Sequence, residues 1–245
     1  MGLAVSITKD LVILAVTKMH GGVCTAGIDA EGIWVRPVRP TTKRIGECDT
    51  ITDYCLLPMD FFHGGESHLV NGGVCRVWLS SHVPARPHVE DWTLDLRQSP
   101  QLLRKLSEPE QVDFLARHSE ADLSALVPDE DRSLGLFLPN AFSFSFAMNP
   151  SGTDISVRAA FTLGSRHFSD ISCTDLRMRA LGRILLEKSS GAPRSLCRAD
   201  FERRGKYLTY LALGLSRLYR GKHWLIVIGV HAIPELVVPI DYGRL

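Results

Sequence analysis

Short apolar runs rich in β-branched residues dominate the first 40 positions, and glycines or acidic residues separate them. Residues 11–17 form a nearly unbroken apolar run, and the glycines at positions 21 and 22 permit a tight reversal after it. The runs at residues 23–28 and 33–38 follow, with the polar turn 29–32 between them. We therefore expect three antiparallel strands in meander order, which would open a small barrel.

Strand patterns continue through most of the chain. Residues 142–146 alternate between phenylalanine and serine, which places three rings on one face, as a half-buried strand requires. The last two strand candidates are joined by residues 217–222, a connection with three cations and Tyr219. The other clear candidates for strands are residues 74–79, 155–163, 207–215 and 223–230.

Two segments carry helical patterns. A serine–proline pair is typical of a helix start and leucines follow it at helical spacing, so we expect a helical insertion at residues 99–120. Thr174 or Asp175 can cap a second helix, at residues 174–188, which has an apolar stripe along one side.

The chain of 245 residues is long enough for two domains, each with ample apolar residues for a core. An acidic surface loop begins at residue 128, and we expect a hinge between this position and Pro139. The patterns together predict a mainly β protein with a few helices. Its first barrel would be residues 1–130, which include the helical insertion, and its second would be residues 131–245.

The net charge of +1 hides an uneven distribution. Residues 1–150 hold 13 Lys and Arg against 19 Asp and Glu, whereas residues 151–245 hold 15 against 8. The basic second part is suited to a nucleic-acid-binding surface, but the same asymmetry is expected if the two parts pair with each other.

The six cysteines are scattered along the chain without a Cys-x-x-Cys pair, and no apolar leader precedes the first strand. The longest apolar runs, such as residues 224–230, are too short to span a bilayer. These features predict a soluble cytoplasmic protein with no membrane partner.

Three parts of the chain together resemble the dual OB-containing domain family, and the resemblance runs over most of the sequence. They are HGGVCTAGID with GIWVRPV near the start, SDISCTDLRMRALGR in the middle, and LALGLSRLYRGKHWLIVIGV near the end. The family is a bacterial module thought to consist of two consecutive OB-type barrels, predicted to bind nucleic acid and often found in mobile-element or defence contexts. The resemblance implies two OB-like barrels in tandem.

The resemblance also picks out individual positions in both halves. In the first half these are Lys18, Cys24, Gly27, Gly32, Trp34, Val35, Arg36 and Pro37. In the second half these are Thr174, Asp175, Leu213, Gly214, Leu215, Arg217 and Trp224.

Arginines and aromatic residues are the binding candidates. Trp34 and Arg36 share one face of their expected strand, so a ring and a planar cation can hold nucleic acid together if that face is solvated. The alternative is that Trp34 belongs to the core and Arg36 is an ordinary surface charge. The arginines of the second helix can reach successive phosphates or form a merely solvated face. The nucleic-acid-binding candidates are Lys18, Trp34, Arg36, Arg39, Arg177, Arg179, Arg183, Arg217, Tyr219 and Lys222.

The histidines offer one weak metal candidate. His63 and His68 lie close together with Glu66 between them, but a zinc site would need Cys55 or Cys75 to converge on the same loop. The glycines inside this segment favour a turn. The sequence has no Gly-x-Ser-x-Gly elbow and no phosphate-binding glycine loop, so we assign no catalytic residue.

The sequence therefore predicts a non-enzymatic, cofactor-free protein that binds DNA or RNA, mostly single-stranded and largely without sequence preference. A nuclease or helicase is conceivable as a partner protein. One alternative is a metal-dependent hydrolase, nuclease or nucleotide-processing enzyme with a site between the halves. Another is a small-ligand sensor or protein-interaction adaptor, which a closed apolar pocket and arginines held in internal salt bridges would favour.

Overall fold

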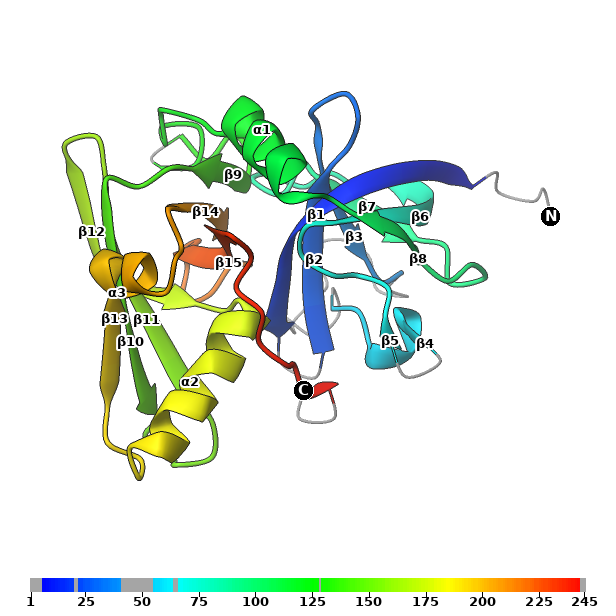
Figure 1. The fold of residues 1–245 in the computed structure, drawn as a ribbon. Coiled ribbons are helices and arrows are strands. Elements are labelled where there is room, and N and C mark those ends of the chain that lie inside the picture. The colour runs from blue at the N-terminus through cyan, green and yellow to red at the C-terminus, as the bar shows by residue number, and fades with distance from the viewer. Residues whose placement is uncertain (1–5, 20–21, 41–54, 64–65, 128, 243–245) are drawn as a thin grey trace. The chain divides into compact units, whose positions relative to one another are not determined.

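A computed structural model describes residues 6–19, 22–40, 55–63, 66–127 and 129–242 of the protein. Most of the described residues lie in or between strands, and three helices accompany them (Figure 1). The chain divides into two compact units. Unit 1 comprises Met1–Ser107, Ser124–Leu134 and Tyr242–Leu245, and unit 2 comprises Glu108–Leu123 and Gly135–Asp241.

Unit 1 contains eight described strands. They are β1 (Ile7–Met19), β2 (Gly22–Ile28), β3 (Trp34–Val38), β4 (Phe62–His63), β5 (Glu66–Ser67), β6 (Gly73–His82), β7 (Asp91–Leu94) and β8 (Gln101–Lys105).

Five of these strands close into a barrel. The ladders run β1–β2–β3–β7–β6, and β6 returns to pair with β1. Every ladder around the barrel is antiparallel except β3–β7, which is parallel. A meander of three strands, one parallel step and a closing hairpin give the five-stranded Greek-key order of an OB-type barrel. The expected meander at residues 11–38 is confirmed.

The 3-10 turn Pro58–Asp60 lies in unit 1, whereas unit 2 contains the remaining strands and the described α-helices. They are α1 (Glu108–His118), β10 (Ala141–Met148), β11 (Ile155–Leu163), β12 (Arg166–Cys173), α2 (Leu176–Lys188), β13 (Arg194–Cys197), α3 (Arg198–Arg203), β14 (Leu208–Leu215) and β15 (Leu225–Ile233). Strand β9 (Leu134–Phe137) crosses the boundary between the units.

The main sheet of unit 2 repeats the strand succession of unit 1. Strands β10, β11 and β12 form a meander, β12 runs parallel to β15, and β15 pairs with β14. Within the described residues no ladder joins β14 to β10. Instead, β9 pairs with β14 and β13 pairs with β10 at the two edges. The second unit therefore has the OB strand order in a sheet that these two extra strands extend.

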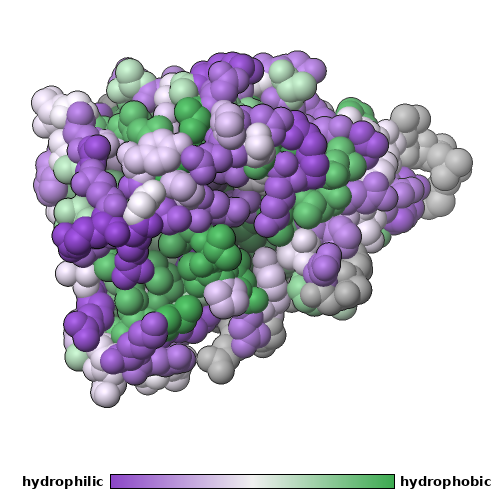
Figure 2. All heavy atoms as spheres, viewed as in Figure 1, coloured by the Kyte–Doolittle hydropathy of each residue, from purple (hydrophilic) through white to green (hydrophobic). Residues whose placement is uncertain are grey.

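Alternation along β10 builds the core of unit 2. Phe142, Phe144 and Phe146 are buried, as the phenylalanine–serine pattern predicts. Helix α2 packs on β10 and β11, and a Cβ atom on Gly182 would lie 2.8 Å from the ring of Phe146. The close approach of helix and strand therefore requires glycine at this position. On the face shown in Figure 2, hydrophobic residues gather where Figure 1 draws α2.

Two predictions about the helical insertion need correction. Residues Gln101–Lys105 are the strand β8 and not the start of a helix, because they pair with the edge of β6. This tertiary pairing overrides the local helical spacing of the leucines. The later part of the insertion does form a helix, α1, but this helix belongs to unit 2. The helix expected at residues 174–188 forms as α2 with Asp175 as its N-cap.

Contacts of one buried carboxylate explain why the chain returns to unit 1 after α1. Glu90 accepts hydrogen bonds from the amide and hydroxyl of Ser133 at 2.8 and 2.9 Å, and from the amide of Leu134 at 3.1 Å. These bonds compensate the burial of the Glu90 charge. None of the helices formed by the described residues has the length and apolar character needed to cross a membrane.

Candidate functional site

The loop between β14 and β15, residues 216–224, has a well-defined backbone. Tyr219 and Lys222 exchange backbone hydrogen bonds of 3.0 and 3.3 Å around a two-residue turn. Arg220 and Gly221 within the turn have φ values of 52° and 78°, the combination found in tight hairpin turns. At the base of the loop, Ser216 donates its amide to the Trp224 carbonyl at 2.8 Å.

This loop exposes two aromatic rings among cations. The side chains of Tyr219 and Trp224 are 50% and 43% exposed, an unusual state for rings of this size. The Trp224 indole donates to the Tyr219 carbonyl at 3.0 Å, which fixes the ring. The Lys222 ammonium lies 3.7 Å from the centre of the Trp224 ring, and the Arg220 guanidinium lies 5.3 Å from that of Tyr219. Residues 216–224 contain no carboxylate.

Strand pairing places the loop beside β12. The parallel ladder joins Ser172 to Ile226 and Cys173 to Val227, so the loop ends next to the residues of β12 that precede Ser172. These residues are largely exposed. The Arg166 guanidinium lies 5.2 Å from the centre of the Phe168 ring, and exposed His167 lies within 3.3 Å of the Thr162 hydroxyl.

We call this combination the loop surface: residues 216–224 together with the outward side chains of β11 and β12. In the OB strand order, β11 and β12 are the second and third strands, and residues 216–224 connect the fourth to the fifth. These are the elements that OB folds use to bind oligonucleotides and oligosaccharides.

The pair Trp34 and Arg36 lies elsewhere, in the interior of unit 1. Their residues are 7% and 5% exposed, so the condition that their shared face be solvated is not met. Arg36 donates from Nε to Asp91 at 2.6 Å, across the parallel β3–β7 ladder in which the two residues are register partners. Burial opposes the charge of Arg36, but the Asp91 carboxylate more than compensates and the pKa of Arg36 is raised.

Arg177 is likewise an internal residue. Its guanidinium donates to the Val230 carbonyl at 2.7 Å and lies 3.4 Å from Glu235. Asp175, which is fully buried, accepts from the amide of Val230 at 3.0 Å and from that of Met178 at 2.9 Å. Burial raises the pKa of Asp175, although Arg177 and the amides act in the opposite direction. Both residues thus attach the start of α2 to β15.

Other predicted cations also have carboxylate partners. Arg179 and Arg183 approach the two oxygens of Asp154 at 2.6 and 3.4 Å, which ties α2 to the start of β11. Arg39 lies 3.3 Å from Asp60. Lys18 is half-buried at the end of β1, opposite Val23.

The structure thus brings together only part of the predicted binding set. Arg217, Tyr219 and Lys222 lie in one loop, whereas the helix and β3 arginines serve internal contacts. Trp224 and Arg220 belong to the same loop but were not among the binding candidates. The signal for them is in the sequence, because SRLYRGKHW holds two rings and three cations without an acid.

The corresponding loop of unit 1 connects β6 to β7. Trp92 lies just after this loop, on β7, where it is half-buried and stacks on His82 with ring centres 4.6 Å apart. The Lys9 ammonium lies 5.9 Å from the same ring. The ring of Trp92 therefore offers less free surface to a ligand than the rings of Tyr219 and Trp224.

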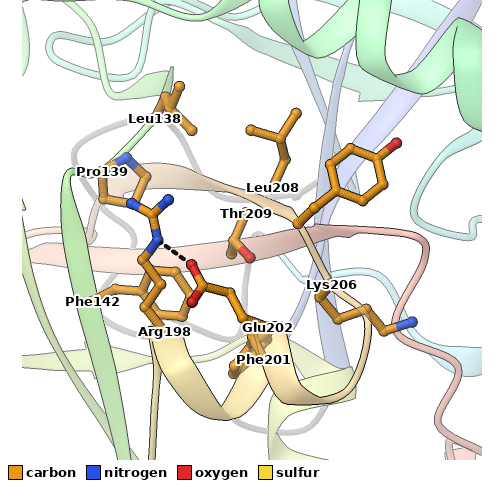
Figure 3. A pocket seen from close by; sticks show the side chains of 10 residues that line it. Leu138, Pro139, Phe142, Arg198, Phe201, Glu202, Lys206, Leu208 and Thr209 are labelled. Atoms are coloured by element: carbon orange, nitrogen blue, oxygen red, sulfur yellow. Dashed lines mark hydrogen bonds and ion pairs between the residues drawn. The ribbon is translucent and has the colours of Figure 1, made fainter.

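Unit 2 also contains a small cavity beside α3 (Figure 3). Phe142 and Phe201 contribute its apolar wall, with ring centres 5.2 Å apart, and the Arg198–Glu202 ion pair borders it. Its volume of about 80 Å³ is well below the roughly 300–1,000 Å³ of small-molecule sites. The internal ion pairs of the arginines meet one condition for a ligand sensor, but this cavity does not supply the closed apolar pocket.

The histidine segment forms the hairpin β4–β5, in which His63 pairs through its backbone with Glu66. The His68 amide donates to the Phe61 carbonyl at 2.9 Å. Across the part of the chain that the structure describes, no three His, Cys, Asp or Glu residues are grouped to hold a metal ion.

The fold and the strand order define a protein built from two OB-type units, one of them a closed five-stranded barrel. The chain belongs to the dual OB-containing domain family, whose model matches residues 9–230, nearly its whole length. The family and OB-fold predictions are therefore confirmed. A comparison with curated proteins found no match.

The buried pair Arg36–Asp91 gives a direct test of the internal role of Arg36. Replacing Arg36 with Met should lower the free energy of unfolding by about 3–5 kcal/mol, because Asp91 keeps its buried charge and loses the guanidinium. Denaturation followed by tryptophan fluorescence measures the change. The matched control is Arg76→Met in the exposed Arg76–Asp10 pair, which should leave stability nearly unchanged. Equal effects of the two substitutions would contradict the assignment.

Proposed function

We propose that this protein binds single-stranded nucleic acid through the loop surface of unit 2, with little sequence preference and without catalysing a reaction. The observation that carries the proposal is the exposure of Tyr219 and Trp224 in one cation-rich loop of defined backbone. Bases stack on such rings whatever their identity, since each base has a π face. The membership of the chain in an OB-type family supports the same function.

The neighbouring charges suit a phosphate backbone. Arg220 and Lys222 are exposed on the loop, and Arg166 is exposed on the adjacent strand β12. Cations spaced along a surface neutralise successive phosphates and release bound counterions, which provides affinity independent of sequence. Arg158 lies on the same sheet face but engages Asp170 at 2.6 Å, so we assign it a structural role.

Binding of nucleic acid through the arginines of α2 is less well supported. Arg177, Arg179 and Arg183 are largely buried and each lies near a carboxylate of its own unit. A phosphate would have to displace those carboxylates and recover the cost of desolvation. Arg220 and Lys222 are exposed on a loop whose own residues include no carboxylate, and we therefore assign phosphate contact to them.

Substitution of the loop rings tests the stacking contribution. Trp224→Ala and Tyr219→Ala should each weaken the affinity for a fluorescein-labelled oligothymidine by roughly 5- to 150-fold, which corresponds to the loss of about 1–3 kcal/mol of stacking. Fluorescence anisotropy at low salt measures the dissociation constants. The matched control is Tyr207→Ala, because Tyr207 is 53% exposed at the opposite end of β14. Binding that is unaffected by both loop variants, or equally weakened by the control, would refute the proposal.

Salt dependence tests the phosphate contacts separately. The logarithm of the binding constant should fall linearly with the logarithm of salt concentration, and Lys222→Ala should reduce the magnitude of that slope by about 0.7 if it removes one phosphate contact. The control is Arg204→Ala, since Arg204 is exposed just after α3 and outside the loop surface. A slope near zero in the unmodified protein would exclude an electrostatic mode of binding. If Lys222→Ala has the same slope as the unmodified protein, Lys222 makes no phosphate contact.

A further inference from the structure

Strand β2 has a short bridge to the segment that follows β3. Val23 and Leu56 exchange two backbone hydrogen bonds, of 2.9 and 2.7 Å, in the antiparallel orientation. Leu56 is fully buried, so the bridge is held by packing as well as by hydrogen bonds. A cysteine stands next to each of these residues, Cys24 on β2 and Cys55 on the facing segment.

The bridge brings the two cysteines opposite each other. Val23 and Leu56 form a hydrogen-bonded pair of the antiparallel type. The residue after one member and the residue before the other then face each other as a non-hydrogen-bonded pair, with Cα atoms about 4.5 Å apart and side chains on one face. Cys24 and Cys55 occupy these positions. Disulfides require Cα atoms roughly 4.4–6.8 Å apart, so the backbone spacing suits a bond between them.

Two further observations place the sulfur atoms together. A Cβ atom built on Gly22 would lie 3.0 Å from the Cys55 Sγ atom, and residues 22 and 24 of a strand share a face. The Cys55 sulfur therefore lies over the face of β2 that carries the Cys24 side chain. Burial raises the pKa of Cys55, and negative charge on Cys24 raises it further, an effect that requires the two groups to be neighbours.

The two thiols differ in access to solvent. Cys24 is half-buried, whereas Cys55 is 2% exposed. Negative charge on Cys24 also contributes to the raised pKa of Arg36, which places a buried guanidinium close to this thiol. Cys24 is the more accessible of the two thiols, so it is the side chain that an oxidant meets first.

We propose that Cys24 and Cys55 are a redox-modification site that forms a reversible disulfide when the protein meets a peroxide. The Cys24 thiolate attacks hydrogen peroxide and becomes a sulfenic acid, with release of hydroxide, which takes up a proton to give water. The Cys55 sulfur then attacks the Cys24 sulfur, the S–S bond forms, and the sulfenic oxygen leaves as a second water with the thiol proton. In sum, two thiols and one hydrogen peroxide give one disulfide and two waters.

The bond would reinforce the Val23–Leu56 bridge covalently. It would join β2 to the segment after β3 and so restrict the unfolded chain across about thirty residues. Unit 1 should therefore unfold at a higher temperature when oxidised, by about 10 °C. The consequence is independent of oligonucleotide binding, because the loop surface belongs to unit 2.

Mass spectrometry of the full chain tests the site directly. The folded protein is treated with an equimolar amount of hydrogen peroxide, its remaining thiols are alkylated, and it is digested without reduction. We expect a cross-linked peptide pair containing residues 24 and 55, lighter by two hydrogens than the separate peptides, and lost on treatment with dithiothreitol. Independent alkylation of both cysteines after peroxide treatment, or a cross-link from Cys24 to any other cysteine, would overturn the proposal.

Variants add a second readout. Cys24→Ser and Cys55→Ser should each abolish the cross-link and the rise in melting temperature on oxidation, while circular dichroism confirms that the variants fold. The matched control is Cys75→Ser, whose native thiol is buried in the same unit and donates to the His68 carbonyl at 2.9 Å. Cys75 does not flank the Val23–Leu56 bridge, and burial raises its pKa to about 11. This control should retain both effects, and a rise in Cys24→Ser equal to that of the unmodified protein would also contradict the proposal.

Discussion

Buried charge at the parallel step of each sheet is the constraint on which this structure depends. An OB-type sheet turns from its meander to its final hairpin through one parallel contact, which is β3–β7 in unit 1 and β12–β15 in unit 2. In unit 1 that contact carries the Arg36–Asp91 ion pair, and in unit 2 Asp175 and Arg177 hold both backbone groups of Val230. A buried ion pair is costly to form but more costly to break, so the pair in unit 1 holds β3 against β7, and the residues in unit 2 hold the start of α2 against β15.

This constraint also separates the residues that maintain the fold from those that can meet a ligand. The arginines of GIWVRPV and of the helix after SDISCTD are the most noticeable cations of the sequence, yet each has a carboxylate near it inside its own unit. In unit 2, β15 begins directly after the loop 216–224. Its parallel pairing with β12 therefore places that loop beside the exposed part of β12. The residues in internal ion pairs therefore serve the fold, and the exposed rings and cations of the loop surface are the ones to which the proposed function assigns binding.

Much of the architecture could be predicted from the sequence, because strand alternation and glycine turns are local signals. The three phenylalanines of β10 and the boundaries of β11 are examples. Alternation also showed that Trp34 and Arg36 share a face, but it could not show that this face is covered, since burial depends on distant segments such as β7. The helix expected at residue 99 was wrong for a related reason, as only the folded chain offers the edge of β6 to that segment. Arg220 was missed, and Trp224 was picked out by the family resemblance but not as a binding residue, because only the folded chain shows that both are exposed.

Buried residues such as Trp34 maintain the fold, and we assign ligand binding to exposed residues such as Trp224. The most direct test of this division is the nuclear magnetic resonance signal of the tryptophan indole groups. The chain has four tryptophans, so a ¹⁵N-labelled sample gives four indole N–H signals during a titration with oligothymidine. The account predicts that the Trp224 signal moves first and furthest, since this ring is 43% exposed on the loop surface, and that the signal of buried Trp34 stays in place. A shift concentrated on Trp34 with Trp224 unchanged would contradict it.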